Sequence, residues 1–364
     1  MEEGTIKSTI EKRMSKLRCE LMKKEINGAL VSKRENYIYL SGFTGTMAYL
    51  LITQNEAILL TDSRYEEQAS RQATSYTVVR YKGSLIVEMN EIIKKFNIKK
   101  LGFEESFLTF YNYQDYKSKL SVQDFVPLEG IIEAQRIIKD NDELEILKKA
   151  VEIADNGFTH ILPYLKPGVR EIEIAAELEY FMKKLGAKGQ SFDMIVASGE
   201  RSSMPHGVAS SKKINLGDVI TLDYGAIYND YCSDMTRTVF LGEPTSEIKK
   251  IYNIVLKAQI SATEEARAGL SGKIIDNISR QIIEMSGYGD YFGHGLGHGV
   301  GLEIHEEPRL APSGNTIMED GMVATIEPGI YIPRVGGVRI EDMLIINGDA
   351  PIILTKSSKE MIIL

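Results

Sequence analysis

Two acidic residues stand where a β-strand rarely carries an acid. Asp223 follows the run 219–222, which is apolar except for Thr221, and Asp234 lies in the returning part of TLDYGAIYNDYCSDMTRT. Aspartate is depleted in strands, and a carboxylate among apolar neighbours needs a partner. If a four-residue loop at 227–230 closes this hairpin, Asp223 faces Asp234 on one side of the sheet. The two carboxylates then repel each other unless a cation lies between them.

A second predicted hairpin repeats this arrangement. Glu327 lies in ATIEPGIYIP and Glu341 in GGVRIEDM, with the turn near Arg334. A hairpin centred there places the two carboxylates opposite each other on one face. Four acids on two hairpins need roughly two divalent ions to be tolerated in a half-buried site. The repetition also indicates an internal duplication.

A histidine in a glycine-rich segment offers a nitrogen ligand to the same site. His298 lies in FGHGLGHGVGLEIHEEP, where the glycines let the backbone pass close to the site. Four carboxylates and one imidazole suit Mn²⁺, Co²⁺, Fe²⁺ or Zn²⁺ rather than Ca²⁺. Two such ions lower the pKa of a shared water, so the spacing predicts a binuclear hydrolase without identifying the bond that it cuts.

The elements that position these residues divide the chain in two. Before residue 122, helical and strand patterns alternate, which predicts a small α/β domain with a mixed sheet. The pattern breaks at 122–130, so we expect a first domain at 1–128 and a second at 129–364. A length of 364 residues also favours two domains over one.

The second half is expected to have an α+β layout. Alternating runs predict antiparallel hairpins, 219–224 with 231–240 and 322–332 with 338–346. A long helix from about 140 to 160 precedes them, with its N-cap at 140–142.

Composition limits the classes of partner and compartment. The net charge of −8 argues against a nucleic-acid partner, because phosphate binding needs a basic face. Two cysteines cannot form a disulfide framework, which fits a reducing compartment. Neither a signal peptide nor an apolar stretch of membrane-spanning length is seen, so we expect a cytoplasmic protein without a membrane partner.

These residues stand in stretches that resemble the pita-bread metallopeptidases, which include methionine aminopeptidase, aminopeptidase P and prolidase. The matching stretches are SxPHG (203–207), LDYGAxYxxYCSDMTRT (222–238), GHGxGHGVGLxxHE (293–306), TIEPGIY (325–331) and GVRIED (337–342). A further block at 36–65 resembles the N-terminal domain of the aminopeptidase P and prolidase branch. The resemblance implies a catalytic domain with a pseudo-symmetric antiparallel sheet and flanking helices, preceded by a smaller α/β domain.

Carried over by position, the resemblance assigns each metal ligand a role. Asp223 is bidentate on one ion, while Asp234 and Glu341 bridge the two ions. His298 and Glu327 ligate the other ion, and Glu327 also moves a proton from water to the leaving amine.

The resemblance also implies a set of residues around the substrate. Histidines that would stabilise the oxyanion and place the proline carbonyl are His206, His294 and His305. Arg339 shares the strand face of Glu341 and would hold a bridging carboxylate in place. Arg309 would grip a free C-terminal carboxylate of the substrate, and Tyr331, in TIEPGIY, would contact the substrate as well.

The expected activity is therefore that of a metal-dependent Xaa-Pro dipeptidase, since Arg309 favours a substrate with a free carboxylate. An Xaa-Pro aminopeptidase, or a broader aminopeptidase acting on longer peptides, is the alternative, and a non-catalytic binding protein of the same fold is a third. Two divalent ions per subunit are expected, with manganese favoured over cobalt, zinc or iron. The resemblance also implies a homodimer, in which we expect the block 36–65 to make contact.

Overall fold

Two units make up the chain, residues 1–136 and 137–364. The computed structural model describes residues 3–348 and 350–364. The division falls beyond the expected boundary at 128/129. The segment 122–130 holds a strand rather than a break, and the short helix that follows it contacts helices of the first unit.

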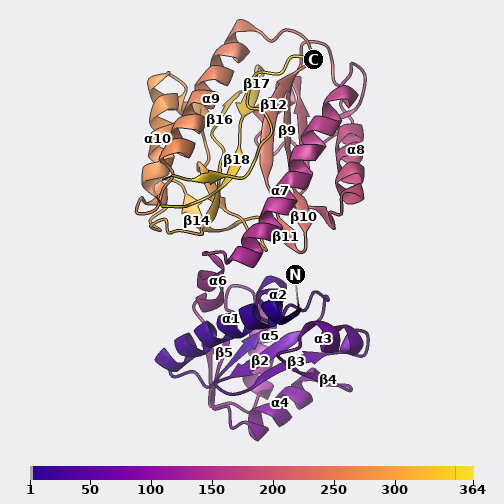
Figure 1. The fold of residues 1–364 in the computed structure, drawn as a ribbon, viewed down its shortest axis with the longest axis vertical. Helices are drawn as coiled ribbons and strands as arrows, with labels where there is room; N and C mark the ends of the chain where they lie inside the picture. Colours follow the sequence, from indigo (N-terminus) through magenta and orange to yellow (C-terminus); the bar gives the residue numbers. More distant parts are fainter. Residues whose placement is uncertain (1–2, 349) are drawn as a thin grey trace. The chain divides into compact units, whose positions relative to one another are not determined.

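The first unit contains a six-stranded sheet in the order β4-β3-β2-β1-β5-β6 (Figure 1). Neighbours among β1, β2 and β3 pair antiparallel and the other pairs are parallel, so the expected α/β domain with a mixed sheet is confirmed. The strands are β1 (Gly28–Val31), β2 (Tyr49–Thr53), β3 (Ala57–Thr61), β4 (Thr77–Arg80), β5 (Lys100–Phe103) and β6 (Asp124–Pro127). The helices are α1 (Glu3–Lys23), α2 (Arg34–Ser41), α3 (Glu66–Gln72), α4 (Leu85–Lys95), α5 (Phe110–Lys119) and α6 (Ile131–Arg136).

The second unit places strands between two pairs of helices, with α9 and α10 on one side and α7 and α8 on the other (Figure 1). Its helices are α7 (Asn141–Ile161), η1 (Leu162–Tyr164), α8 (Glu171–Lys184), η2 (Gly199–Ser203), α9 (Ser246–Glu265), α10 (Gly272–Met285) and η3 (Gly289–Tyr291). Its strands are β7 (Gly189–Gln190), β8 (Ile195–Ser198), β9 (Val219–Tyr224), β10 (Ala226–Tyr228), β11 (Tyr231–Cys232), β12 (Met235–Phe240), β13 (Gly297–Gly299), β14 (Glu306–Leu310), β15 (Val323–Ile326), β16 (Gly329–Ile332), β17 (Gly336–Arg339), β18 (Asp342–Ile345) and β19 (Ile352–Ile353). The expected α+β layout is confirmed.

The first acid-bearing hairpin closes more tightly than expected. Its turn is the two-residue step Asn229-Asp230, with φ of 46° and 68°, a conformation that suits a two-residue hairpin turn. The four-residue loop at 227–230 is therefore wrong, and the register moves by two positions. Asp223 faces Thr236 instead of Asp234. Because side chains alternate with a period of two, this shift keeps both acids on the same face of the hairpin.

The second hairpin has the expected register. Ile326 pairs with Asp342 before the site, and Gly329 pairs with Arg339 after it. The same register on both sides places position 327 opposite position 341. Both acids lie between named strands, where the ladder is interrupted and side chains and backbone can turn toward a site.

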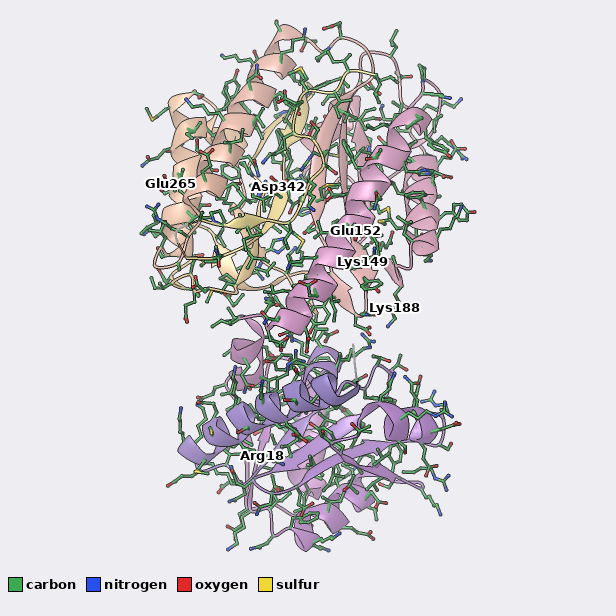
Figure 2. The ribbon with its side chains drawn as sticks, in the orientation of Figure 1. Arg18, Lys149, Glu152, Lys188, Glu265 and Asp342 are labelled. Atoms are coloured by element: carbon green, nitrogen blue, oxygen red, sulfur yellow. The ribbon has the colours of Figure 1, made fainter. Side chains whose placement is uncertain are left out.

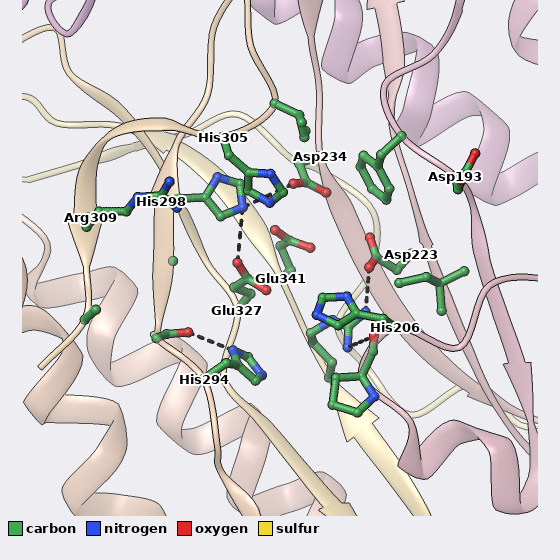
Figure 3. Close-up of a pocket in the computed structure, with 18 of the residues that line it drawn as sticks. Asp193, His206, Asp223, Asp234, His294, His298, His305, Arg309, Glu327 and Glu341 are labelled. Atoms are coloured by element: carbon green, nitrogen blue, oxygen red, sulfur yellow. Dashed lines mark hydrogen bonds and ion pairs between the residues drawn. The ribbon is translucent and has the colours of Figure 1, made fainter. Parts of the chain in front are cut away.

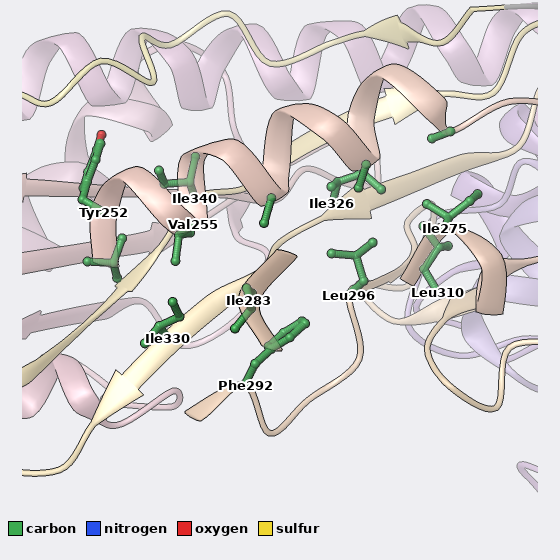
Figure 4. Packing of buried hydrophobic residues seen from close by; sticks show 14 of the residues in the cluster. Tyr252, Val255, Ile275, Ile283, Phe292, Leu296, Leu310, Ile326, Ile330 and Ile340 are labelled. Carbon is green, nitrogen blue, oxygen red and sulfur yellow. The ribbon is translucent and has the colours of Figure 1, made fainter. Parts of the chain in front are cut away.

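Apolar packing behind these hairpins fixes their position. Helix α9 begins at Thr245, whose side chain accepts a hydrogen bond from the Ile248 amide. It contacts β15, β16 and β17, and Val255 on its buried face belongs to the same cluster as Ile326 and Ile340 (Figure 4). The hairpin that carries Glu327 and Glu341 is thus held by a fully buried core.

A buried ion pair lies directly beside the second hairpin. The guanidinium of Arg237 donates to Asp342 at 2.7 Å, and both side chains are 1% exposed. Lys359 and Gln259 also donate to the other carboxylate oxygen of Asp342. Asp342 is labelled inside the second unit in Figure 2, where Lys149 and Glu152 lie on the outer face of α7.

No helix among residues 3–348 and 350–364 is long and apolar enough to cross a membrane.

We expect Asp342→Asn to lower the free energy of unfolding of the second unit by about 3–5 kcal/mol, because it leaves the Arg237 charge buried without a full counter-charge. Glu152→Gln is the matched control, since Glu152 meets Lys149 at an exposed surface. Its effect should stay below about 1 kcal/mol. Urea unfolding followed by circular dichroism in EDTA measures both, and equal effects would contradict a structural role for the Arg237–Asp342 pair.

Candidate metal centre

Three predicted ligands converge closely enough to share one ion. Asp234, His298 and Glu341 are all buried, and one ligand atom from each lies within 4.8 Å of the others. They come from three segments far apart in the sequence: the link before β12, strand β13 and the link between β17 and β18. Figure 3 shows these side chains directed toward one another across a common space.

The fourth and fifth predicted ligands border the same group. Glu327 approaches the Nε2 atom of His298 to 3.3 Å, and Asp234 approaches the same atom to 3.6 Å. Asp223 lines the same cavity from β9. All five predicted ligands are therefore brought together in the second unit.

The imidazole of His298 is oriented by its other nitrogen. Its Nδ1 lies 3.1 Å from the carbonyl oxygen of Gly299, which can only accept a hydrogen bond, so Nδ1 carries the proton. The Nε2 atom faces Asp234 and Glu327. It can therefore either bind a metal ion or hold a proton that it shares with one of these carboxylates. This orientation by a backbone carbonyl is typical of metal-binding histidines.

Two buried carboxylate oxygens of the site lack a hydrogen-bond partner among the described residues: Oδ1 of Asp223 and Oε1 of Glu341. A buried polar atom without a partner costs about 1–3 kcal/mol, and more when it is charged. A divalent cation would satisfy both atoms, and a set of four carboxylates and one imidazole is a suitable donor set for it. The residues present therefore fit the metal pair that the sequence predicts.

The electrostatics of the four acids point in the same direction. Burial raises the pKa of Asp223, and it raises the pKa of Asp234 and Glu341 well above their ordinary values, with the neighbouring carboxylates adding to each shift. Burial also raises the pKa of Glu327, but the hydrogen bond and charge of His298, together with the charges of His294 and Arg339, bring this pKa below its ordinary value. Without a cation, ionising all four acids is electrostatically unfavourable.

Arg339 holds one acid of the site, although not the kind expected. Its Nη2 donates to Asp223 at 2.5 Å, and its Nε donates to Thr236 at 3.1 Å. We expected it to hold a bridging carboxylate, but the structure pairs it with the acid assigned to a single ion. Thr236 instead donates to Glu341 at 2.7 Å, because the corrected register places this threonine between the two hairpins.

The remaining predicted residues divide between the cavity and its wall. His206, His294, His305 and Arg309 line a cavity of about 460 Å³ together with the five predicted ligands. Tyr331 is not among its lining residues. Its hydroxyl accepts from Arg339 at 2.8 Å and lies 2.9 Å from Nε2 of His294, so it supports the wall behind the site.

The histidines in the cavity differ in their freedom to meet a substrate. Nδ1 of His294 faces the carbonyl oxygen of Gly295 at 2.7 Å and its Nε2 faces Tyr331, so both ring nitrogens are engaged. His305 packs edge-on against His298 with the ring centres 4.4 Å apart. Burial lowers the pKa of both His294 and His305, which favours their neutral forms.

Sequence reasoning missed three residues that matter to this geometry. Thr236 links Arg339 to Glu341, and Thr325 accepts from the amide of His298 and donates to Glu327. Both threonines stand in the matched stretches, where buried hydroxyls near acids are a usable signal. Asp193 lines the cavity from outside any matched stretch and gave no signal.

Comparison with known proteins agrees with this site. A model of Metallopeptidase family M24 matches residues 145–348, and a model of the Creatinase/Prolidase N-terminal domain matches residues 13–138. An Xaa-Pro dipeptidase of Pyrococcus furiosus is 42% identical over 353 residues, which cover 97% of this chain and 100% of the relative.

Solved structures are similar to this chain over both of its units. An Xaa-Pro dipeptidase from Bacillus anthracis is 48% identical, with a TM-score of 0.95, 98% of this chain covered and 100% of that one. An X-Pro aminopeptidase from Thermotoga maritima is 38% identical, with a TM-score of 0.89, 93% of this chain covered and 98% of that one. The expected fold, a pita-bread domain preceded by an α/β domain, is confirmed.

The crowded acids predict how pH affects the metal-free protein. The unfolded chain has ordinary pKa values of 3.8 for Asp234 and 4.5 for Glu341, whereas the folded values are raised. The folded state then binds more protons, so its stability falls as the pH rises above these ordinary values. Asp234→Asn removes one charge, so in EDTA near neutral pH we expect it to raise the melting temperature, by about 2–4 °C for each kcal/mol of repulsion relieved.

With Mn²⁺ added, the same substitution should act in the opposite direction. The wild type should gain stability because the ion binds only the folded site, and Asp234→Asn should gain less because it has lost a ligand oxygen. Differential scanning fluorimetry with and without EDTA measures both effects. A metal-free Asp234→Asn protein that melts below the metal-free wild type would refute the inferred repulsion.

Proposed function

Because this chain belongs to metallopeptidase family M24, we propose that it is an Xaa-Pro dipeptidase that hydrolyses the peptide bond before proline. The observation that carries the proposal is the pair of buried, unpartnered oxygens on Asp223 and Glu341, in a cavity that Arg309 also lines. The first feature fits a metal-dependent hydrolase, and the second fits a substrate with a free carboxylate.

The five ligands would hold two divalent ions, with Asp234 and Glu341 between them. Asp223 would serve one ion, and His298 and Glu327 the other. When bound, the ions would supply an activated water and stabilise the negative charge that develops on the carbonyl oxygen. We favour manganese, because carboxylate-rich sites suit it, with cobalt, zinc or iron as alternatives.

Glu327 is the residue best placed to move the proton. Its carboxylate lines the cavity beside the other candidate ligands, where it would accept a proton from water and deliver it to the leaving nitrogen of proline. Thr325 donates to Oε1 of this carboxylate, and Nε2 of His298 lies 3.3 Å from the same oxygen. His206 and His305 line the cavity and would contact the substrate, while Arg339 and Tyr331 keep Asp223 and His294 in place.

Glu327→Gln keeps the shape of the side chain but removes the proton acceptor. We expect kcat for Gly-Pro to fall by about 10²–10⁴-fold. Metal content measured by atomic emission separates loss of the proton path from loss of metal. Glu319→Gln, at an exposed position outside the cavity, is the control. A Glu327→Gln protein that holds metal and keeps wild-type kcat would rule out this role.

Substrate length is the point on which the family alternatives differ. An Xaa-Pro aminopeptidase, the alternative, acts on longer peptides in which proline has no free carboxylate. Such an enzyme would need no cationic side chain at that place. We therefore expect higher kcat/KM for Gly-Pro and Met-Pro than for the matching Xaa-Pro-Xaa tripeptides with added Mn²⁺. A preference for tripeptides would overturn the dipeptidase assignment.

Arg309 provides an independent test of the same point. Arg309→Ala should raise KM for Gly-Pro at least tenfold, the loss of about 1.4 kcal/mol of a charge-assisted hydrogen bond, and should change KM for Gly-Pro-amide much less. Equal effects on the two substrates would contradict carboxylate recognition by Arg309.

The proposal also includes a homodimer, which rests on family precedent. Sedimentation velocity measures this oligomeric state.

A non-catalytic binding protein of this fold is the third candidate function. Such a protein would bind no divalent ion and would show no activity after Mn²⁺ or Co²⁺ is added.

A further inference from the structure

One acid in the cavity remains outside the metal centre. Of the acids that line it, Asp193 alone is not among the five predicted ligands. Its side chain is exposed, and it makes no hydrogen bond or ion pair with any residue that the structure describes. We propose that Asp193 selects substrates that carry lysine or arginine before proline, an inference that rests on the proposed function.

The backbone around Asp193 is fixed, so its position does not depend on the bound ligand. The amide of Ser191 donates to the carbonyl of Gly225 at 3.0 Å, and the amide of Ala209 donates to the carbonyl of Met194 at 3.1 Å. Asp193 lies between these two anchors. The backbone that carries this carboxylate therefore does not have to be ordered when a cation binds.

The polarity of the substrate directs its first residue toward Asp193. Figure 3 shows Arg309 and Asp193 on opposite sides of the acids of the metal centre. If Arg309 holds the carboxylate of proline and the reacting bond lies over the acids, then the residue before proline extends away from Arg309. It therefore extends toward Asp193.

The partner of Asp193 is a long side chain rather than the α-ammonium. The α-ammonium is attached one carbon from the reacting carbonyl, so it must stay beside the buried acids of the centre. Asp193 stands at the exposed side of the cavity. The four-carbon stem of lysine, or the similar stem of arginine, carries a cation from the buried acids toward the exposed side of the cavity.

An apolar surface connects the two places. Ile195 pairs with Asp223 in the sheet and forms a bridge with Val208, and both side chains line the cavity beside Phe192. Methylene groups of lysine and arginine pack on such surfaces while the charged end remains in water. Asp223 is already paired with Arg339, so it does not compete for the cation.

The test compares Lys-Pro with norleucine-Pro, which has a stem of similar length and no ammonium. We expect the wild type with Mn²⁺ to show kcat/KM about 3–5-fold higher for Lys-Pro, as suits a solvent-exposed charge pair. Asp193→Asn should bring this ratio close to one, and Asp193→Lys should invert it. The ratio should also fall as salt is added. Asp290→Asn, an exposed acid outside the cavity, should keep the wild-type ratio.

Each outcome decides a separate point. A ratio near one in the wild type, or a ratio that Asp193→Asn leaves unchanged, overturns the inference. If Asp193→Asn lowers turnover of both dipeptides equally, Asp193 binds the α-ammonium and the inference is wrong. If norleucine-Pro is hydrolysed, the proposed function stands whatever the ratio. If neither dipeptide is hydrolysed, the proposed function fails and the inference falls with it.

Discussion

Repulsion among four carboxylates, three of them buried and that of Glu327 half-buried, is the constraint on which the second unit depends. Asp223, Asp234, Glu327 and Glu341 come from two hairpins and meet in one cavity, where burial and mutual charge raise the pKa of three of them. A fold gains nothing from such crowding unless a cation relieves it. Binding of divalent ions at this site would therefore be linked to folding, because the ions would relieve a repulsion that the folded chain creates.

The surrounding residues hold the acids in place without neutralising all of them. Arg339 neutralises the charge of Asp223 alone. The hydroxyl groups of Thr236 and Thr325 donate to Glu341 and Glu327, but they carry no charge. A second basic side chain near Asp234 or Glu341 would neutralise these two carboxylates without a metal ion. Behind this layer, the Arg237–Asp342 pair carries a charge of each sign in the core, and Arg237 also donates to the carbonyl of Glu341. The candidate metal centre is thus supported by a polar network.

Much of the fold follows from patterns that act over short distances. The alternating runs around Asp223 and Glu327 predict hairpins, because a half-buried strand has a period of two. The N-cap at Asp140 follows from local hydrogen bonding, and the structure shows a capping box between Asp140 and Glu143. The turn at Asn229-Asp230 was misread, since Ile227 and Tyr228 continue the strand, and only the pairing of whole strands distinguishes the two loop lengths.

By itself, the sequence singled out the five candidate ligands and the side of each hairpin on which the four acids lie, because strand parity survives a two-residue error in register. Only the tertiary structure decided which groups touch. Arg339 donates to Asp223, Tyr331 lies behind His294, and Asp193 reaches the cavity without a partner among the described residues. The first of these contacts joins residues 116 apart in the sequence and the second joins residues 37 apart, so packing between elements sets them and local spacing does not record them.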